Sequence, residues 1–495
     1  MISSLRSEYD QTMNRDRPKS KFAIQFRMRW VPAALLLSVS AAGLGTPALL
    51  SHGRFRDFPV YLPAGKPAGF TMLLSGDEGW TPAVEDLAHR LAQRGAMVVG
   101  IDLAKLKANL NSDSNECVFP DGDLENLSHF VQAYERAPNY LAPLLVGYGT
   151  GGTFAYAMLA QAPRNTFAGA LTLGFQPGLE LDKPLCRGSG VEFVKRASGH
   201  GVDFLPSQNL GNPWVALQGE KDRVAPFPAA RDFVAKVRGA AVVPLPNVGH
   251  DFAATALWLP QFAAAYDKLA AGNPMARVAP PAGLSDLPII EIPARPSAGA
   301  AGPAAADSFA IFMSGDGGWA GLDQDVAGAL AANGIPVVGL DSLRYYWNAR
   351  TPDGVAADTD RMIRFYLAHF AKQRVLLVGY SQGADVLPFA VNRLPAASHA
   401  HVGLVALMGM SEHALFEFHL TSWVSDDNSG PATLPEIHRI ADIPVVCIYG
   451  ADENDSLCPK LDPKAFKVVK LKGGHHFDGD YAGLASTIIS SAKPR

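Results

Sequence analysis

The chain has 495 residues, 48% of them hydrophobic and 18% charged, which is enough apolar sequence for two globular domains. Its formal net charge of -4 offers no basic face, so the composition argues against a nucleic-acid-binding protein. We therefore expect a folded, two-domain protein that acts on something other than DNA or RNA.

Residues 1–50 are predicted to hold an export signal. Arg27 and Arg29 precede WVPAALLLSVSAAGLGTPALL, an uncharged stretch of Leu, Ala and small residues. Positive charge followed by such a run is typical of a secretory signal peptide, which predicts an exported protein. Because the basic segment is long, a later start at Met13 or Met28, or an uncleaved membrane anchor, is an alternative. A buried helix of the first domain is another.

The rest of the sequence is a tandem duplication. Four pairs of segments repeat: DFPVYLPA (57–64) and DLPIIEIPA (286–294), LSGDEGW (74–80) and MSGDGGW (313–319), VVGID (98–102) and VVGLD (337–341), VGYGTGGT (146–153) and VGYSQGAD (378–385). We expect one domain at 51–271 and a second copy at 284–495. The Pro- and Gly-rich residues 272–283 between them are expected to form a linker.

Within each copy, short apolar runs alternate with amphipathic segments. The second copy shows FAIFMSG, a helical pattern over 323–333, IPVVGLD, another over 358–372, RVLLVGY, a third over 384–393, VGLVALMG and IPVVCIYG. Apolar runs of strand length with helix-length spacers predict a mainly parallel sheet covered on both faces. The predicted fold class is α/β, with two tandem, three-layer domains.

Four cysteines occur, two in each copy. Cys117 and Cys186 belong to the first copy, and Cys447 and Cys458 to the second. In an oxidising compartment this distribution favours one disulfide within each domain. Four buried free thiols are the alternative, since the sequence does not give the Cα separations.

The strongest chemical signal is Gly379-Tyr380-Ser381-Gln382-Gly383, which follows a predicted strand and precedes a predicted helix. G-x-S-x-G in that context is the nucleophile elbow of α/β-hydrolases, where a tight turn lifts the serine hydroxyl above the sheet. We therefore predict that both copies are α/β-hydrolase-like and that Ser381 is the nucleophile.

A nucleophilic serine needs a base and an acid, and in this fold the acid comes before the histidine in the chain. The first copy guides the choice. Asp222 stands four residues before a proline, as Asp455 does in the second copy. His250 follows a glycine and stands two residues before a phenylalanine, as His475 does. The expected triad is Ser381, Asp455 and His475.

Other residues in the same loops are alternatives. His476 adjoins the predicted base, and Asp452 or Glu453 could orient the imidazole in place of Asp455. A metal site in HHFDGD (475–480) is disfavoured, because adjacent histidines on an extended loop point apart. We expect no metal and no cofactor.

The tetrahedral intermediate of acyl transfer needs backbone N–H donors for its oxyanion. The N–H of Gln382, directly after the nucleophile, is the first expected donor. The loop around Asp316 and Gly317, whose glycines let backbone approach a substrate, is the second. A simple tight turn is the alternative for that loop.

The second copy resembles the VirJ/AcvB family of exported bacterial proteins, α/β-hydrolases associated with virulence and envelope lipids. The resemblance rests on SGDGGW (314–319), GLDSLRYYWNARTPD (339–353), GYSQGAD (379–385), YGADENDSLCP (449–459) and GGHHFDGDY (473–481). These motifs cover nearly all of residues 284–495, and the two-copy layout is similar to the longer AcvB type. The resemblance implies a periplasmic serine esterase that removes the aminoacyl group, typically lysyl, from aminoacylated phosphatidylglycerol.

Charged and aromatic residues near the expected site suit such a substrate. Asp316, Asp452 and Glu453 could attract its ammonium groups, and Arg344 or Arg350 its phosphodiester. A solvated loop with core-packed aromatics is the alternative for the two arginines.

Residues 411–439 contain Phe416, Phe418 and Trp423. An insertion at this place could form a cap that meets acyl chains or the bilayer surface. A packed excursion without lipid contact is the alternative.

Two other functions remain open from the sequence. The first, which the family resemblance implies, is an envelope interaction protein linked to type IV secretion, and the second is an esterase acting on another envelope ester. In the first copy Gly149 stands where Ser381 stands in the second, although Asp222 and His250 are present. We expect the first domain to be catalytically silent.

Overall fold

The structure is a computed structural model that describes residues 47–113, 115–197, 200–208, 210–271, 281–295, 307–418 and 430–492. The predicted export signal before residue 47, residues 272–280 of the predicted linker, and Trp423 lie outside these residues.

The first domain is built on an eight-stranded sheet whose strand order is β1-β2-β4-β3-β5-β6-β10-β11. The strands are β1 (Ala48–His52), β2 (Phe55–Tyr61), β3 (Gly69–Leu74), β4 (Ala96–Ile101), β5 (Pro143–Tyr148), β6 (Gly169–Leu173), β10 (Trp214–Gly219) and β11 (Ala240–Leu245). From β4 to β11 every pairing is parallel, while β1 and β2 are antiparallel additions at one edge.

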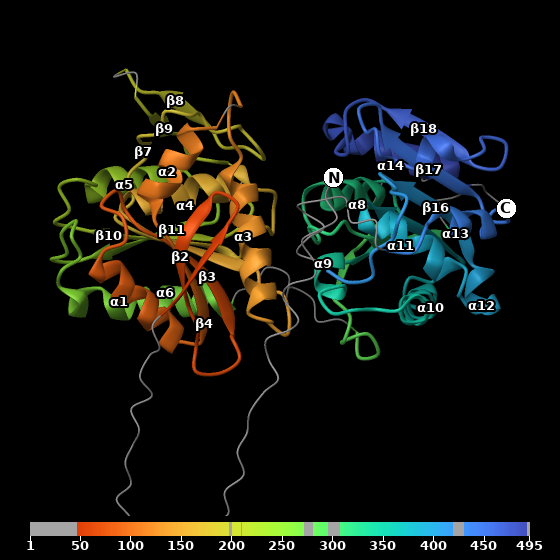
Figure 1. Cartoon of the computed structure of the whole chain (residues 1–495), viewed down its shortest axis with the longest axis horizontal. Helices are drawn as coiled ribbons and strands as arrows, with labels where there is room; N and C mark the ends of the chain where they lie inside the picture. Colours follow the sequence, from red (N-terminus) through yellow and green to blue (C-terminus); the bar gives the residue numbers. More distant parts are fainter. Residues whose placement is uncertain are drawn as a thin grey trace, which may run out of the picture. The chain divides into compact units, whose positions relative to one another are not determined.

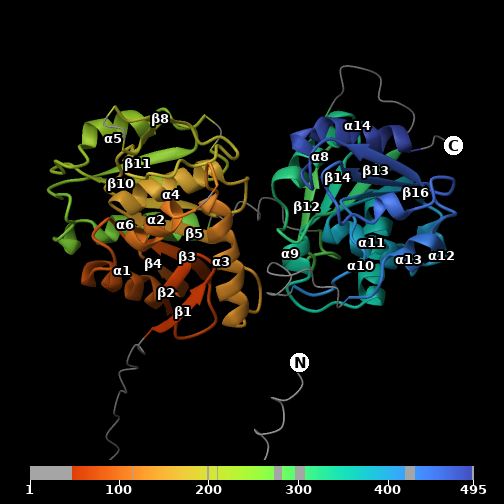
Figure 2. The ribbon, with the colours of Figure 1, turned by 45° about the horizontal axis from the view of Figure 1, so that its top comes forward.

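Helices lie on both faces of this sheet, as Figures 1 and 2 show. They are α1 (Pro82–Gln93), α2 (Leu103–Asn111), α3 (Pro120–Tyr134), α4 (Thr150–Gln161), α5 (Phe227–Val234) and α6 (Leu259–Ala271), with a 3₁₀ turn η1 (Thr255–Leu257). Helices α1 and α6 share one buried apolar cluster, and α2 to α5 share the other. A small sheet of β7 (Gly178–Leu179), β8 (Phe193–Lys195) and β9 (Val202–Phe204) completes the domain.

The second domain repeats this plan in a seven-stranded sheet whose strand order is β12-β14-β13-β15-β16-β17-β18. The strands are β12 (Ile289–Ile292), β13 (Ser308–Met313), β14 (Val337–Leu340), β15 (Arg374–Tyr380), β16 (Val402–Met408), β17 (Val445–Gly450) and β18 (Lys467–Leu471). Only β12 pairs antiparallel, at the sheet edge.

The helices of the second domain again cover both faces (Figures 1 and 2). They are α8 (Gly321–Ala332), α9 (Ser342–Tyr345), α10 (Pro352–His369), α11 (Gln382–Val391), α12 (Ala396–His399), α13 (Leu434–Arg439) and α14 (Tyr481–Ser491), with 3₁₀ turns η3 (Cys458–Lys460) and η4 (Phe477–Gly479). Helices α8 and α14 pack on one face, and α10, α11 and α13 on the other. The predicted fold class, two tandem α/β-hydrolase-like domains with mainly parallel sheets, is confirmed.

The repeated tryptophan and glycine motifs have a packing cause. A Cβ on Gly339 would stand 2.5 Å from the ring of Trp319, and one on Gly100 would stand 2.4 Å from the ring of Trp80. The strand glycine therefore makes room for the tryptophan that follows the preceding loop, in both copies.

Two boundaries differ from the sequence prediction. Strand β1 begins at Ala48, inside the segment assigned to the export signal, because its residues pair with β2. Helix α10 begins at Pro352, six residues before the predicted Asp358. The Thr351 side chain accepts a hydrogen bond from the N–H of Gly354, and proline is favoured at the first helical position.

Candidate active site

Ser381 lies at the tip of the tight turn between β15 and α11, with φ 51° and ψ −122°. A Cβ on Gly379 would stand 2.5 Å from the carbonyl oxygen of Gly383, and a Cβ on Gly383 would stand 2.2 Å from that of Met313. Neither position can hold a side chain, so the G-x-S-x-G pattern is a steric requirement of this turn. Ser381 is the residue that the turn presents at its tip.

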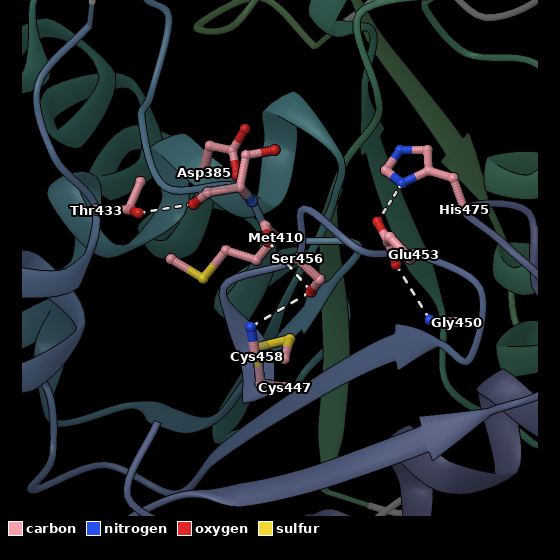
Figure 3. Close-up of a disulfide and its surroundings, with 10 residues drawn as sticks. Asp385, Met410, Thr433, Cys447, Gly450, Glu453, Ser456, Cys458 and His475 are labelled. Carbon is pink, nitrogen blue, oxygen red and sulfur yellow. Dashed lines mark hydrogen bonds and ion pairs between the residues drawn. A yellow bond between two sulfur atoms is a disulfide. The ribbon is translucent and has the colours of Figure 1, made fainter. Parts of the chain in front are cut away.

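The acid beside the histidine is Glu453, and the expectation of Asp455 is wrong. His475 Nδ1 lies 2.5 Å from Glu453 Oε1, and the Glu453 side chain is only 6% exposed. Its other oxygen accepts a hydrogen bond from the N–H of Gly450 at 3.1 Å (Figure 3). Asp455 is exposed on the same loop.

Counting from the strand end, instead of back from the proline, finds the acid in both domains. Asp222 is the third residue after Gly219, and Glu453 is the third after Gly450. The two glycines are equivalent, because each is the last residue of the strand before the acid and packs against the histidine loop. A Cβ on Gly219 would stand 2.5 Å from the carbonyl oxygen of Val248, and one on Gly450 would stand 2.2 Å from that of Gly474. Counting back from the proline gave the wrong residue because the proline follows the acid by four residues in the first domain (Asp222, Pro226) and by six in the second (Glu453, Pro459).

Carboxylates control the protonation of His475. Burial alone would lower its pKa, but the hydrogen bond and charge of Glu453, together with the charges of Asp316 and Asp455, raise the pKa above its ordinary value. The neighbouring His476 has a lowered pKa, because of burial first and the charge of His475 second. His475 is therefore the histidine whose protonated form the site stabilises.

Two residues that the sequence analysis did not single out position this histidine. The Tyr380 hydroxyl donates to the carbonyl oxygen of His475 at 3.3 Å, and the two rings lie 5.1 Å apart. Gly409, with φ +61°, directly follows β16, and a Cβ on it would stand 2.6 Å from His475 Cε1. The available signal was repetition, since Tyr148 and Gly174 hold the same places in the first copy.

The expected oxyanion loop lies against the nucleophile through Gly315, since a Cβ built on this glycine would stand 3.4 Å from Ser381 Cβ. The Gly318 N–H donates to the Gly315 oxygen and closes the turn that contains Asp316 and Gly317. The N–H of Gln382 belongs to the first turn of α11, where backbone donors lack helical partners. The assignment of Gln382, Asp316 and Gly317 as oxyanion donors stays a prediction.

The predicted substrate-binding residues have different surroundings. Asp452 is exposed, and Asp316 is close enough to influence His475. Both oxygens of Glu453 already accept hydrogen bonds, so the structure gives no support to its predicted role in holding a substrate ammonium.

The two predicted phosphate-binding arginines are engaged by the protein. The side chains of Arg344 and Asp341 approach to 3.6 Å. The guanidinium of Arg350 lies 4.4 Å from the centroid of the Tyr345 ring and donates to the Tyr345 carbonyl. Tyr345 and Tyr346 are fully buried, as the core-packing alternative expected.

The expected cap is described at residues 411–418 and 430–439. Phe416 packs edge-on against Phe389, and Phe418 stacks on Trp347. The cap also reaches the elbow, because the Gln382 side chain donates to the carbonyl oxygen of Leu415 at 3.0 Å. These contacts are those of the packed excursion that was the alternative.

Each domain contains one disulfide, Cys117–Cys186 in the first and Cys447–Cys458 in the second. The second disulfide closes the loop that carries Glu453 (Figure 3). Near it, the Leu457 N–H donates to the carbonyl oxygen of Met410 at 2.7 Å. The acid loop is therefore tied to its own strand and to the end of β16.

The family description "Bacterial virulence protein (VirJ)" matches residues 69–176 and 307–495, together more than half of the sequence. The chain belongs to the VirJ family. The two matched segments include both elbow turns, so the first copy shares in the resemblance as well as the second. No curated protein sequence matches this VirJ-family chain.

Several solved esterase structures are similar to parts of it. The esterase domain of a Rhodothermus marinus protein is 15% identical, with 43% of this chain and 91% of that one covered and a TM-score of 0.29. Est1E from Butyrivibrio proteoclasticus is 12% identical, with 46% and 100% covered and a TM-score of 0.31. Native Est2 from Thermogutta terrifontis is 15% identical, with 48% and 96% covered and a TM-score of 0.32.

Among the residues that the structure describes, no helix combines the length and apolar character needed to cross a membrane.

Proposed function

We propose that this VirJ-family protein is a periplasmic serine esterase that cleaves the aminoacyl ester of aminoacylated phosphatidylglycerol, with lysyl as the preferred group. The observation that carries the proposal is Ser381 on a nucleophile elbow whose Tyr380 contacts His475, the histidine paired with the buried Glu453. Binding alone would need no such arrangement.

The chemistry follows from the tautomer that Glu453 selects. With Nδ1–H directed at the glutamate, the Nε2 lone pair of His475 is free to take the proton of Ser381 Oγ as it attacks the ester carbonyl. Collapse of the tetrahedral intermediate breaks the bond to the glycerol oxygen, which receives that proton from His475, and phosphatidylglycerol leaves. Water then attacks the acyl-enzyme in the same way, releasing the amino acid and restoring the serine.

The charge around the site supports a cationic acyl group. Asp316 and Asp455 both act electrostatically on His475. Asp385, four residues after the nucleophile, is buried in α11, and its pKa is raised by burial and further by the charges of Asp316 and Glu453. A lysyl ester brings two ammonium groups to this acidic neighbourhood, which would relieve the repulsion among the carboxylates.

The decisive experiment follows release of lysine from lysyl-phosphatidylglycerol in mixed micelles by the purified protein and by Ser381→Ala. Release by the parent protein alone supports the proposal, whereas equal release by both contradicts it. No release by the parent, together with fluorophosphonate labelling of Ser381, would indicate an esterase for another ester. Alanyl-phosphatidylglycerol is the matched substrate that lacks the side-chain ammonium. Asp316→Asn should lower the ratio of kcat/KM for the lysyl lipid to kcat/KM for the alanyl lipid.

A second role, binding of a type IV secretion component, would need no nucleophile, and the first domain has Gly149 in the place of one. A deletion strain complemented with Ser381→Ala separates the two roles. Restored secretion with this variant would support the binding role, and failure to restore it would assign the phenotype to hydrolysis.

A further inference from the structure

The nucleophile-free elbow of the first domain keeps the conformation of the catalytic elbow. Gly149 has φ 55° and ψ −123°, against 51° and −122° for Ser381. Each residue donates its N–H to the carbonyl oxygen at the end of the adjacent strand, Leu173 at 2.8 Å and Met408 at 2.9 Å. The turn has therefore not relaxed, although no serine hydroxyl has to be presented.

The base and its acid are also in place. His250 Nδ1 lies 2.9 Å from Asp222 Oδ2, and the Asp222 side chain is fully buried while that of His250 is 33% exposed. The Tyr148 hydroxyl donates to the carbonyl oxygen of His250 at 3.2 Å, the bond that Tyr380 makes to His475 in the second domain. The imidazole edge that faces the elbow is thus oriented as in an active hydrolase.

Only the nucleophile is missing, and there is room for it. A Cβ built on Gly149 meets no atom closer than His250 Nε2, at 4.0 Å. A serine hydroxyl on that carbon would come within hydrogen-bond reach of the imidazole.

The oxyanion side is likewise retained. The Gly79 N–H donates to the Gly76 oxygen at 3.1 Å, the same turn that the second domain closes between Gly318 and Gly315. Thr150 Oγ1 lies 3.8 Å from the Cβ position of Gly76 and is buried without a hydrogen-bond partner among the described residues. An unpartnered buried hydroxyl beside an empty elbow fits a polar ligand that completes the site.

We propose that the first domain is a preorganised site for carboxylic esters, which holds the ester carbonyl at the Thr150 turn beside His250 without forming an acyl-enzyme. The site keeps the elbow turn and the histidine–acid pair of the proposed catalytic one, with Asp222 in place of Glu453 and no side chain at the elbow tip. It therefore binds the same chemical class and does not turn it over. This inference does not depend on the identity of the lipid substrate.

Installing the missing atom tests the site directly. The full-length protein carrying Gly149→Ser and Ser381→Ala is treated with a fluorophosphonate probe, and the labelled peptide is identified by mass spectrometry. We expect label at residue 149, none in Ser381→Ala alone, and labelling at least tenfold slower when His250→Gln is added. A folded double variant that takes no label would overturn the proposal.

Gly149→Ala with Ser381→Ala controls for backbone strain, since it adds a Cβ but no oxygen. If substitution at Gly149 unfolds the domain, a second measurement tests the site without changing this residue. In Ser381→Ala, the imidazole NMR signals of His250, assigned by their loss in His250→Gln, should shift on addition of butyl phosphonate, an analogue of the ester oxyanion. Signals that do not move at saturating phosphonate would equally overturn the proposal.

Discussion

The two domains hold their acids in different ways. In the first, Asp222 Oδ1 accepts hydrogen bonds from the N–H groups of Val224 and Ala225, at 2.9 and 2.8 Å, while Oδ2 faces the histidine. In the second, the longer Glu453 accepts one backbone bond, from Gly450, and its loop is closed by a disulfide. A short acid can be fixed by its own turn, whereas a longer one depends on the loop that carries it.

The largest expected effect tests the division of labour between the domains. Ser381→Ala should lower kcat for ester hydrolysis by at least about 10³-fold, because no other group supplies the nucleophile. The measurement is steady-state hydrolysis of lysyl-phosphatidylglycerol, with an unchanged melting temperature as the control for folding. Substantial turnover remaining in this variant would mean that the first domain is not silent.

The next effect distinguishes the two candidate acids. Glu453→Gln should lower kcat by roughly 10²–10⁴-fold, because the amide cannot stabilise the imidazolium that forms during proton transfer. Asp455→Asn, on the same loop but exposed, is the matched control and should change kcat by less than about threefold. The reverse order of effects would restore Asp455 as the acid.

The third prediction compares the two disulfides by the effect that removing each has on kcat and on the free energy of unfolding. Replacing Cys447 and Cys458 by serine should lower kcat, because the loop bearing Glu453 is released, and should cost about 3 kcal/mol of unfolding free energy in the chain-entropy model. The Cys117–Cys186 disulfide closes a longer loop that does not carry the acid. Replacing both cysteines by serine should therefore lower the unfolding free energy by about 4 kcal/mol and leave kcat unchanged.

Both pairs are measured by denaturant unfolding and by the rate of fluorophosphonate labelling at Ser381. Equal labelling rates in the two double variants would show that the second disulfide stabilises the domain without positioning the acid.

The smallest effect concerns pH. His475 acts as a base only when neutral, and its pKa is raised above the ordinary value of about 6.5, with Glu453 the main group that raises it. Activity should therefore rise with pH through a midpoint above that value. In Glu453→Gln the protonated imidazole loses its partner, so the midpoint of the residual kcat/KM profile should move to lower pH. A profile that does not move would exclude Glu453 as the group that raises this pKa.

Much of the molecule could be predicted from local spacing. The parallel strands and alternating helices could be predicted from apolar runs of strand and helix length, and the duplication from the recurrence of those runs and their flanking motifs in the same order. The elbow could be predicted because its geometry forces glycine at two positions around Ser381. The histidine could be predicted from the repeat of its flanking glycine and phenylalanine.

What the sequence by itself determined is therefore the fold class, the nucleophile turn and the histidine loop, all of which depend on residues close together in the chain. Only the tertiary structure decided the acid, because Asp452, Glu453 and Asp455 are close in sequence and differ in where the end of β17 directs them. It also decided that Gly409 must lack a side chain, since this follows from its contact with His475, which is distant in the chain.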